Sequence, residues 1–247
     1  MILIRLNMTD QLLHGLLAKY YDRLYSYRDY LDEAVKIQNL IIKYSPIEPT
    51  TILDVACGTG LHLKHLKDDF KCIGVDISKD MLKIARKNVK GVVFKQADMK
   101  KLELKKQFDV ITCLLSSIGY LKNNRYLNKT LKNFYDHLVK GGLILVEPSQ
   151  ARSFYVSGKP PITFYDGKDL KLTRLNKSKI RNNIAHLTMH IVIAEKGKEV
   201  KYFADNHKLG IFGISETLKI MRNIGFKCKF LANGFMNGRG LLIGIKK

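Results

Sequence analysis

The sequence has few cysteines, no long hydrophobic run and no cluster of metal-binding residues. The four cysteines are isolated from one another and form no C-x-x-C pair, which excludes a disulfide framework and the common zinc sites; they are Cys57, Cys72, Cys113 and Cys228. No segment approaches the length of a membrane span, and Met1–Leu6 is too short for the hydrophobic part of a signal peptide. We therefore expect a cytoplasmic protein that uses neither a metal ion nor a membrane.

Acidic residues are also scarce. The chain has 22 acidic and 43 basic side chains, so its formal net charge is +21. Such a strong positive charge is consistent with a nucleic-acid partner. However, 33 of the basic residues are lysines, no tract of five basic residues occurs, and aromatic residues are not interleaved with the basic ones. We interpret the charge as a lysine-coated surface with a general preference for anionic small molecules. RNA or DNA stays an alternative partner, and retention on heparin at moderate salt would favour it.

A glycine-containing motif is the strongest positive signal. In Thr51–Gly60 (TILDVACGTG) a short apolar run of strand type precedes Gly58 and Gly60, and a helical pattern follows. A strand, a glycine turn and a helix together present backbone N–H groups and a positive helix end to a nucleotide-like ligand. Leu63 stands where a dinucleotide site would have its third glycine, and Asp54 lies in the strand itself. The motif therefore predicts a nucleotide-like ligand other than a dinucleotide.

Further strands are predicted at regular intervals after this motif. The first of them, Lys71–Val75, ends at Asp76, where a carboxylate can accept hydrogen bonds from both hydroxyls of a ribose. The later ones are Val92–Lys95, Phe108–Leu114 and Gly142–Val146. Because helical patterns separate these strands, the chain is predicted to form a doubly wound, mostly parallel sheet. The ligand should then lie beyond the carboxyl ends of the strands.

These motifs resemble those of class I S-adenosylmethionine (SAM) methyltransferases, in which Asp-x-Ala-x-Gly-x-Gly is a variant of the cofactor motif. Residues 18–148 are similar to the SAM-dependent N,N-dimethyltransferases that finish deoxyamino sugars for macrolide glycosylation. The likeness is carried by Leu53–Leu63, Ala97–Met99, Phe108–Cys113, Ser116–Gly119 and Val146–Pro148, and it extends to Thr173-Arg174 and Gly238–Leu241. The resemblance implies a Rossmann-like α/β fold with a seven-stranded sheet, an antiparallel β insertion before the last helix, and a terminal hairpin.

The resemblance also implies roles for individual residues. Asp76 would bind the ribose of SAM, and Asp98 would lie beside its adenine. The other cofactor contacts that it implies are Tyr21, Tyr30, Asp54, Ala56, Gly58, Gly60, Ile77, Met99 and Leu114. The substrate contacts would be Tyr25, Ser117, Arg174, His207 and Arg239, with the two arginines suited to a diphosphate.

Two departures from the family concern the acceptor site. Tyr120 stands where the sugar enzymes carry a histidine. We assign Tyr120 as the catalytic residue, and because a tyrosine has an unperturbed pKa of about 10, we expect it to orient an amine rather than deprotonate it. The aromatic Glu-Pro-Trp-Trp stretch of the family is replaced by Glu147-Pro148-Ser149-Gln150, so we expect a different acceptor shape.

We predict one domain made of four parts. They are an N-terminal helical lid (9–45), the SAM-binding core (46–148), a β insertion over the active site (149–210), and a last helix with the terminal hairpin (211–247). The lid is predicted as two helices, the first capped by Thr9 or Asp10 with Leu12, Leu13, Leu16, Leu17 and Tyr20 as its apolar face. Ser215 is predicted to cap the last helix.

The predicted function is methyl transfer from SAM to a small-molecule acceptor, an amine such as that of a nucleotide-linked amino sugar. An RNA or DNA methyltransferase is the first alternative, although Ser116–Gly119 replaces the Asn/Asp-Pro-Pro-Tyr signature of base-amino methylation. A non-catalytic SAM-binding protein is the second alternative. The complete cofactor motifs, together with an insertion predicted to cover the active site, argue against it. The sequence does not identify the acceptor, and it leaves a homodimer open.

Overall fold

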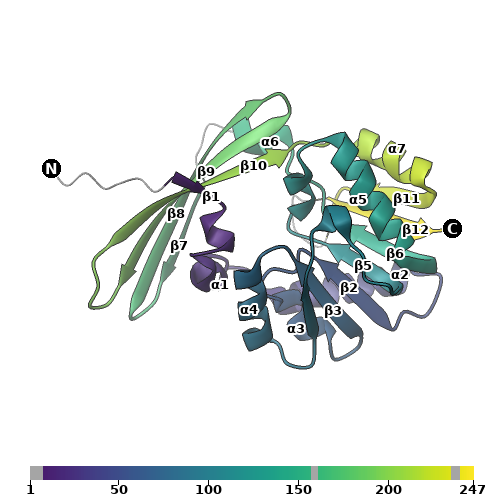
Figure 1. The fold of residues 1–247 in the computed structure, drawn as a ribbon, viewed down its shortest axis with the longest axis horizontal. Helices are drawn as coiled ribbons and strands as arrows, with labels where there is room; N and C mark the ends of the chain where they lie inside the picture. Colours follow the sequence, from purple (N-terminus) through teal and green to yellow (C-terminus); the bar gives the residue numbers. More distant parts are fainter. Residues whose placement is uncertain (1–7, 157–160, 235–239) are drawn as a thin grey trace.

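The computed structural model describes residues 8–156, 161–234 and 240–247, which form two β-sheets with helices packed around them (Figure 1). The larger sheet has seven strands in the order β11-β12-β6-β5-β2-β3-β4. They are β2 (Thr51–Val55), β3 (Lys71–Asp76), β4 (Val93–Gln96), β5 (Phe108–Cys113), β6 (Leu138–Val146), β11 (Phe226–Leu231) and β12 (Leu241–Lys246). The first five are parallel, and β11 and β12 add an antiparallel hairpin beside β6. The predicted seven-stranded, mostly parallel sheet is confirmed.

Helices cover both faces of this sheet, as the alternation of strand and helix patterns predicts. One face carries α2 (Tyr30–Tyr44), α3 (Leu61–Leu66) and α4 (Lys79–Asn88); the other carries α5 (Asn124–Asp136) and α7 (Ile214–Ile224). The central strands β2 and β5 are therefore buried on both sides, and a binding site can form only where the strands end.

Two predicted boundaries are wrong. Ser215 does not cap α7, because Gly213 adopts an extended conformation and the helix already begins at Ile214. The strand predicted to begin at Gly142 begins instead at Leu138. Leu138 pairs with Phe108 of β5, and the register of the two strands shifts between Phe108 and Val110.

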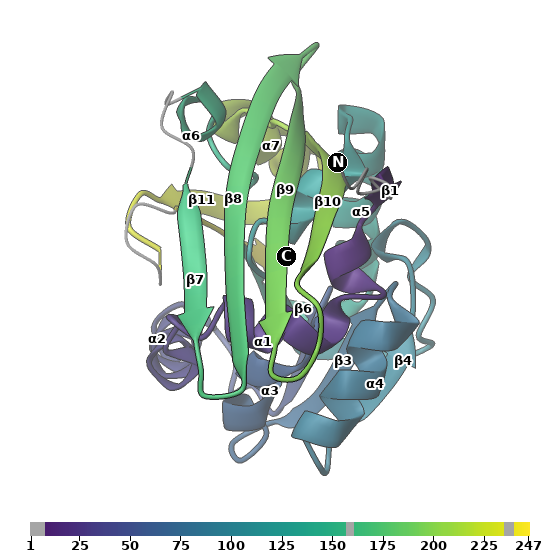
Figure 2. The ribbon, with the colours of Figure 1, turned by 90° about the vertical axis from the view of Figure 1, so that its left-hand side faces the viewer.

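The second sheet has five strands in the order β1-β10-β9-β8-β7 (Figure 2). They are β1 (Met8–Asp10), β7 (Ile162–Asp166), β8 (Leu170–Arg181), β9 (Ile184–Glu195) and β10 (Lys201–Gly210), and the short helix α6 (Arg152–Val156) precedes β7. Strands β7 to β10 are antiparallel neighbours, which confirms the antiparallel β insertion that the family resemblance implies. The hairpin between β8 and β9 turns on Asn182 and Asn183, whose φ values of 48° and 57° fit a type I′ turn.

The first of the two helices predicted for residues 9–44 does not form. Residues 8–10 are strand β1, which pairs in parallel with β10. The 3₁₀ turns η1 (Leu12–His14) and η2 (Ala18–Tyr20) and the single-turn helix α1 (Tyr21–Leu24) follow. The cause is a side chain far along the sequence: Asp205 accepts hydrogen bonds from the Leu12 and Leu13 N–H groups at 2.7 and 2.8 Å and fixes the backbone there.

This N-terminal segment lies between the two sheets (Figure 1). Its buried Leu13, Leu17 and Leu24 pack against apolar side chains of the second sheet, whereas Leu16, assigned above to the same apolar face, is 71% exposed. The segment therefore joins the second sheet to the edge of the first where the strands end. None of the helices in the described ranges is long and apolar enough to cross a membrane.

Candidate active site

The glycine motif forms a tight loop between β2 and α3. Ala56, Gly58 and Gly60 all have positive φ values, of 59°, 55° and 77°. The Cys57 N–H donates to the carbonyl of Val75 at 3.0 Å, which ties the loop to β3. A Cβ on Gly58 would meet no atom within 4 Å, so this glycine leaves its backbone open to the neighbouring cavity. A Cβ on Gly60 would lie 3.0 Å from the Phe94 ring of β4 and 3.3 Å from Cβ of Ala85 in α4, so that glycine lets the loop pack closely against these two elements.

Asp76 at the end of β3 is held by backbone amides. Its Oδ2 accepts the Gly58 N–H at 2.8 Å, and its Oδ1 accepts the Ser78 N–H at 2.8 Å. Burial raises the pKa of Asp76, and these amides oppose the rise. Each carboxylate oxygen keeps acceptor capacity for a ligand, because an ionised carboxylate offers about four lone-pair sites. The carboxylate is thus oriented before a ligand arrives.

Asp54 on β2 is a second carboxylate, and it is 3% exposed. Its Oδ1 accepts a hydrogen bond from the Thr112 hydroxyl at 2.8 Å. Burial raises the pKa of Asp54 to about 6, although His62 and Thr112 act in the opposite direction. A positively charged ligand nearby would favour the ionised carboxylate.

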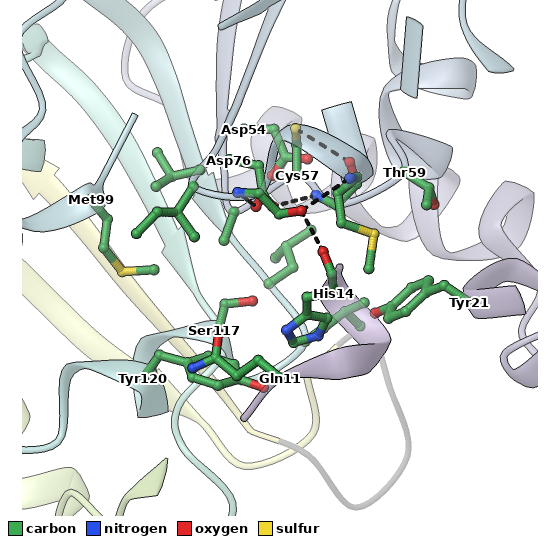
Figure 3. Close-up of a pocket in the computed structure, with 18 of the residues that line it drawn as sticks. Gln11, His14, Tyr21, Asp54, Cys57, Thr59, Asp76, Met99, Ser117 and Tyr120 are labelled. Carbon is green, nitrogen blue, oxygen red and sulfur yellow. Dashed lines mark hydrogen bonds between the residues drawn. The ribbon is translucent and has the colours of Figure 1, made fainter. Parts of the chain in front are cut away.

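A cavity of about 690 Å³ lies at these strand ends. Figure 3 shows Asp54 and Asp76 on one side of it, with His14, Ser117 and Tyr120 on the other. The predicted site residues that line it are Tyr21, Tyr25, Tyr30, Asp54, Ala56, Gly58, Asp76, Ile77, Asp98, Met99, Leu114, Ser117 and Tyr120. Met189 of β9 also lines it, so the second sheet contributes to the cavity. Gly60, Arg174 and His207 are not among the residues that line it, and Arg239 lies outside the described residues.

The N-terminal segment contributes residues that the sequence motifs do not indicate. Gln11, His14 and Arg28 all line the cavity. The Arg28 guanidinium donates to Glu33 at 2.6 Å, and the same carboxylate lies 2.7 Å from Nε2 of His62, so three charged or polar groups share one buried network. The position of Arg28 inside a tyrosine-rich stretch is the one sequence signal that could have marked it. Gln11 and His14 precede the stretch of family likeness and carry no such signal.

Tyr120 in η4 (Ser117–Leu121) contacts a buried histidine of the second sheet. Its hydroxyl lies 2.9 Å from Nδ1 of His207, and Nε2 of His207 lies 3.0 Å from Oδ2 of Asp205. Burial raises the pKa of Tyr120 well above the ordinary value. Asp205 was not among the predicted residues, although its two-residue spacing from His207 places both side chains on one face of a strand.

Arg174 of β8 is 5% exposed, and its guanidinium lies 4.7 Å from the centre of the Tyr25 ring. Its buried Nε and Nη1 atoms have no hydrogen-bond partner. Burial acts to lower the pKa of Arg174, but Tyr25 and neighbouring tyrosines outweigh it and raise that pKa. Arg174 therefore carries buried donors beside a residue that lines the cavity.

Comparisons with known proteins agree with this site. Residues 52–142 match the family model described as a methyltransferase domain. The chain is 33% identical to dTDP-3-amino-3,4,6-trideoxy-alpha-D-glucopyranose N,N-dimethyltransferase of Streptomyces venezuelae, over 92% of this chain and 97% of that one. It is 30% identical to dTDP-3-amino-3,6-dideoxy-alpha-D-glucopyranose N,N-dimethyltransferase of Streptomyces fradiae, over 94% and 91%.

Solved structures share the fold over nearly the whole chain. The crystal structure of Streptomyces venezuelae DesVI matches with a TM-score of 0.87 at 32% identity, over 94% of this chain and 98% of that one. SAM-bound CalS10 of Micromonospora echinaspora, an amino pentose methyltransferase, has the same fold, with a TM-score of 0.82 at 23% identity over 98% and 99%.

The fold, the glycine loop and the acidic residues at the ends of β2 and β3 together define a class I methyltransferase that uses SAM. Within this class, the chain belongs to the family of SAM-dependent methyltransferases that includes the dTDP-amino-sugar N,N-dimethyltransferases. The chemical properties of the site residues also fit SAM. The ionised Asp76 can accept from ribose hydroxyls, the buried Asp54 suits a ligand with positive charge, and Gly58 leaves room for close approach.

Proposed function

We propose that this enzyme methylates the amino group of a nucleotide-linked amino sugar. Three relatives that match more than 90% of the chain are named for such acceptors. The observation that carries the proposal in this structure is Arg174, a buried arginine with unpaired Nε and Nη1 atoms beside Tyr25. A guanidinium with unpaired donors is suited to the phosphate oxygens of an anionic acceptor, which would reach Arg174 if the neighbouring Tyr25 side chain moves aside. Arg239, assigned to the same diphosphate by family resemblance, lies outside the described residues.

We assign the cofactor-binding roles to residues at the strand ends. Asp76 would hold the ribose hydroxyls and Asp98 would lie beside the adenine. Tyr21 of α1 and Tyr30 of α2, which both line the cavity, would pack against SAM. These roles leave the end of the cavity that is lined by Tyr25, Ser117 and Tyr120 for the acceptor.

SAM supplies a methyl group that is already activated by its sulfonium. The main task of the chain is therefore to align the acceptor with that methyl group and to exclude water. An amine attacks through its lone pair, so it must be unprotonated when it reacts. Tyr120 lines the cavity and would hydrogen-bond the amine, and Ser117 lines it from the same 3₁₀ turn.

Methyl-transfer assays with matched acceptors test this function. The panel contains a dTDP-linked amino sugar, the same amino sugar without the nucleotide, a dTDP sugar with a hydroxyl in place of the amine, and an RNA oligonucleotide. We expect the first to have the highest kcat/KM, the second a raised KM, and the other two no methylation. Methylation of RNA, or equal kcat/KM with and without the nucleotide, would contradict the proposal.

A further inference from the structure

A row of three hydrogen-bonding side chains leads away from the acceptor end of the cavity. The Tyr120 hydroxyl is 2.9 Å from Nδ1 of His207, and Nε2 of His207 is 3.0 Å from Oδ2 of Asp205. Tyr120 lines the cavity, whereas His207 and Asp205 are 2% and 0% exposed. Only the first member of the row can therefore touch an acceptor, and the other two act through it.

Asp205 determines which nitrogen of His207 carries the proton. Burial acts to raise the pKa of Asp205, but His207 and the N–H groups of Leu12 and Leu13 outweigh it and hold that pKa below its ordinary value. The carboxylate of Asp205, which can only accept when it is ionised, then pairs with an N–H at Nε2 of His207. Nδ1 is left as an acceptor that faces the Tyr120 hydroxyl, so Tyr120 donates to His207 and keeps a lone pair for a group in the cavity.

We propose that Tyr120 and His207 form a proton acceptor for the amine, with Tyr120 as the catalytic residue and His207 and Asp205 positioning it and storing the proton. The proposal rests on the proposed function, because it requires an amine acceptor. Tyr120 accepts a proton from the nitrogen, and its own hydroxyl proton passes to Nδ1 of His207. His207 becomes an imidazolium beside Asp205 and returns the proton through Tyr120 to the cavity after the product leaves.

The atoms balance in this step. The nitrogen–carbon bond forms while the carbon–sulfur bond of the methyl donor breaks, and the electron pair of that bond stays on sulfur. Before the nitrogen–carbon bond forms, the bound ammonium gives one N–H proton to Tyr120 while the hydroxyl proton of Tyr120 passes to His207, so the nitrogen gains a free lone pair and the methylated nitrogen carries one positive charge. Tyr120 is unchanged at the end, because it gains one proton and loses another. No oxidant or additional reactant is needed.

The surroundings of His207 suit this role. His14 of η1 packs at 5.4 Å from the His207 ring and 5.6 Å from the Tyr120 ring. Burial, with His207 nearby, lowers the pKa of His14 to about 4, so His14 is neutral near pH 7 and does not compete for the proton. On the adjacent strand β9, the residues paired with Asp205 and His207 are Met189 and Leu187, which are apolar.

The second sheet contains a matched control pair. Nδ1 of His190 lies 2.6 Å from the Tyr202 hydroxyl, with the two residues on neighbouring strands β9 and β10. The alternation of side chains along a strand places His190 on the face opposite Met189, which lines the cavity. This pair reproduces the tyrosine–histidine contact of Tyr120 and His207 without access to the acceptor.

The pH dependence of methylation tests the proposal. In Tyr120→Phe and His207→Gln, we expect kcat at pH 7 to fall about a hundredfold, the scale of general-base catalysis. We expect most of this loss to disappear near pH 9.5, where the amine loses its proton to solvent. SAM affinity should stay the same, and Tyr202→Phe and His190→Gln should match the wild type at every pH. A loss of equal size at all pH values, or no loss, would overturn the proposal.

A second measurement separates this proposal from the proposed function, because it needs no acceptor. In ¹⁵N NMR spectra of the SAM complex, the His207 ring should carry its proton on Nε2, and His207→Gln identifies the resonance among the seven histidines. Asp205→Asn should shift the proton toward Nδ1. A wild-type ring protonated on Nδ1 overturns the proton acceptor, whatever the acceptor assays show. Failure of the wild type to methylate any amine would instead refute the proposed function.

Discussion

Gly58 donates its backbone N–H to Oδ2 of Asp76 at 2.8 Å and thereby joins the carboxyl ends of β2 and β3. The two parts of the cofactor motif, the glycine loop and the acidic residue of the next strand, are thus one hydrogen-bonded unit. Ser78 adds a second amide to the same carboxylate, and its hydroxyl donates to the carbonyl of His14 in the N-terminal segment. The orientation of Asp76 is therefore fixed by two amides, and the serine that supplies one of them is bound to the N-terminal segment.

Replacing Asp76 by alanine should weaken SAM binding by about 1–3 kcal/mol, the usual scale for losing hydrogen bonds to a charged group. The ribose would lose its acceptor, and the Gly58 N–H would lose its partner. Isothermal calorimetry on the folded variant measures the change. Asp68→Ala removes an exposed carboxylate and should bind SAM like the wild type. An unchanged affinity in Asp76→Ala would refute the ribose-binding role.

Asp54 predicts a pH dependence of stability. Its folded-state pKa, about 6, lies above the unfolded value of 3.8, so the folded state binds the proton more tightly. The stability that Asp54 contributes is complete below about pH 4 and is lost as the pH rises through 6. The loss is about 3 kcal/mol, at about 1.4 kcal/mol for each pKa unit.

The variant Asp54→Asn isolates this effect, because it keeps an oxygen for the Thr112 hydroxyl and removes the titration. Urea unfolding of both proteins between pH 4 and pH 7 should show the wild type losing stability relative to the variant as the pH rises. Saturating SAM should reduce this trend, because a positively charged ligand favours the ionised carboxylate. Parallel stability curves for the two proteins would contradict the assignment.

Gly74 on β3 lies beneath the glycine loop and leaves it room to pack. A Cβ there would lie 2.7 Å from two ring carbons of Phe94 and 2.9 Å from the Cys57 sulfur. Gly74→Ala should therefore lower the free energy of unfolding by about 1–3 kcal/mol, as overpacked cores do. Adding Phe94→Leu should recover part of the loss. A double-mutant cycle in which the two changes are simply additive would contradict this packing argument.

Replacing Arg174 by glutamine should raise the KM for a nucleotide-linked acceptor by about 10- to 100-fold, the scale of a lost hydrogen bond to a charged group. The change in kcat should be smaller, because a contact remote from the reacting atoms stabilises the ground and transition states alike. Arg181→Gln changes an exposed arginine of the same strand and should leave both constants unchanged. A dominant fall in kcat, or a fall in SAM affinity, would exclude the phosphate role.

The large sheet could be predicted because its signals are local. The apolar runs of β2, β3 and β5, the glycine loop and the acidic residue at the end of β3 all lie within short stretches of sequence. The N-terminal strand could not be predicted in this way. The amides of Leu12 and Leu13 are bound by Asp205, more than 190 residues away, and no local pattern reports such a contact.

The candidate site shows the same difference between residues marked by local sequence signals and residues placed by long-range contacts. Residues that follow strands of the large sheet, such as Asp76, Asp98 and Met99, line the cavity as predicted. Gln11 and His14 reach it only because β1 pairs with β10, so their participation depends on tertiary structure. The partner of Tyr120 depends in turn on the register of β10, which alone decides whether His207 or a neighbour faces inward.

The parallel pairing of β1 with β10 has a consequence for how the chain is made. Synthesis begins at the N-terminus, and β1 has no strand to pair with until residues 201–210 have left the ribosome. The strands of residues 51–146 can assemble before that point, since they pair among themselves. Closing so long a loop is a late, non-local event. The cofactor cavity therefore acquires its N-terminal wall only when most of the enzyme has been synthesised.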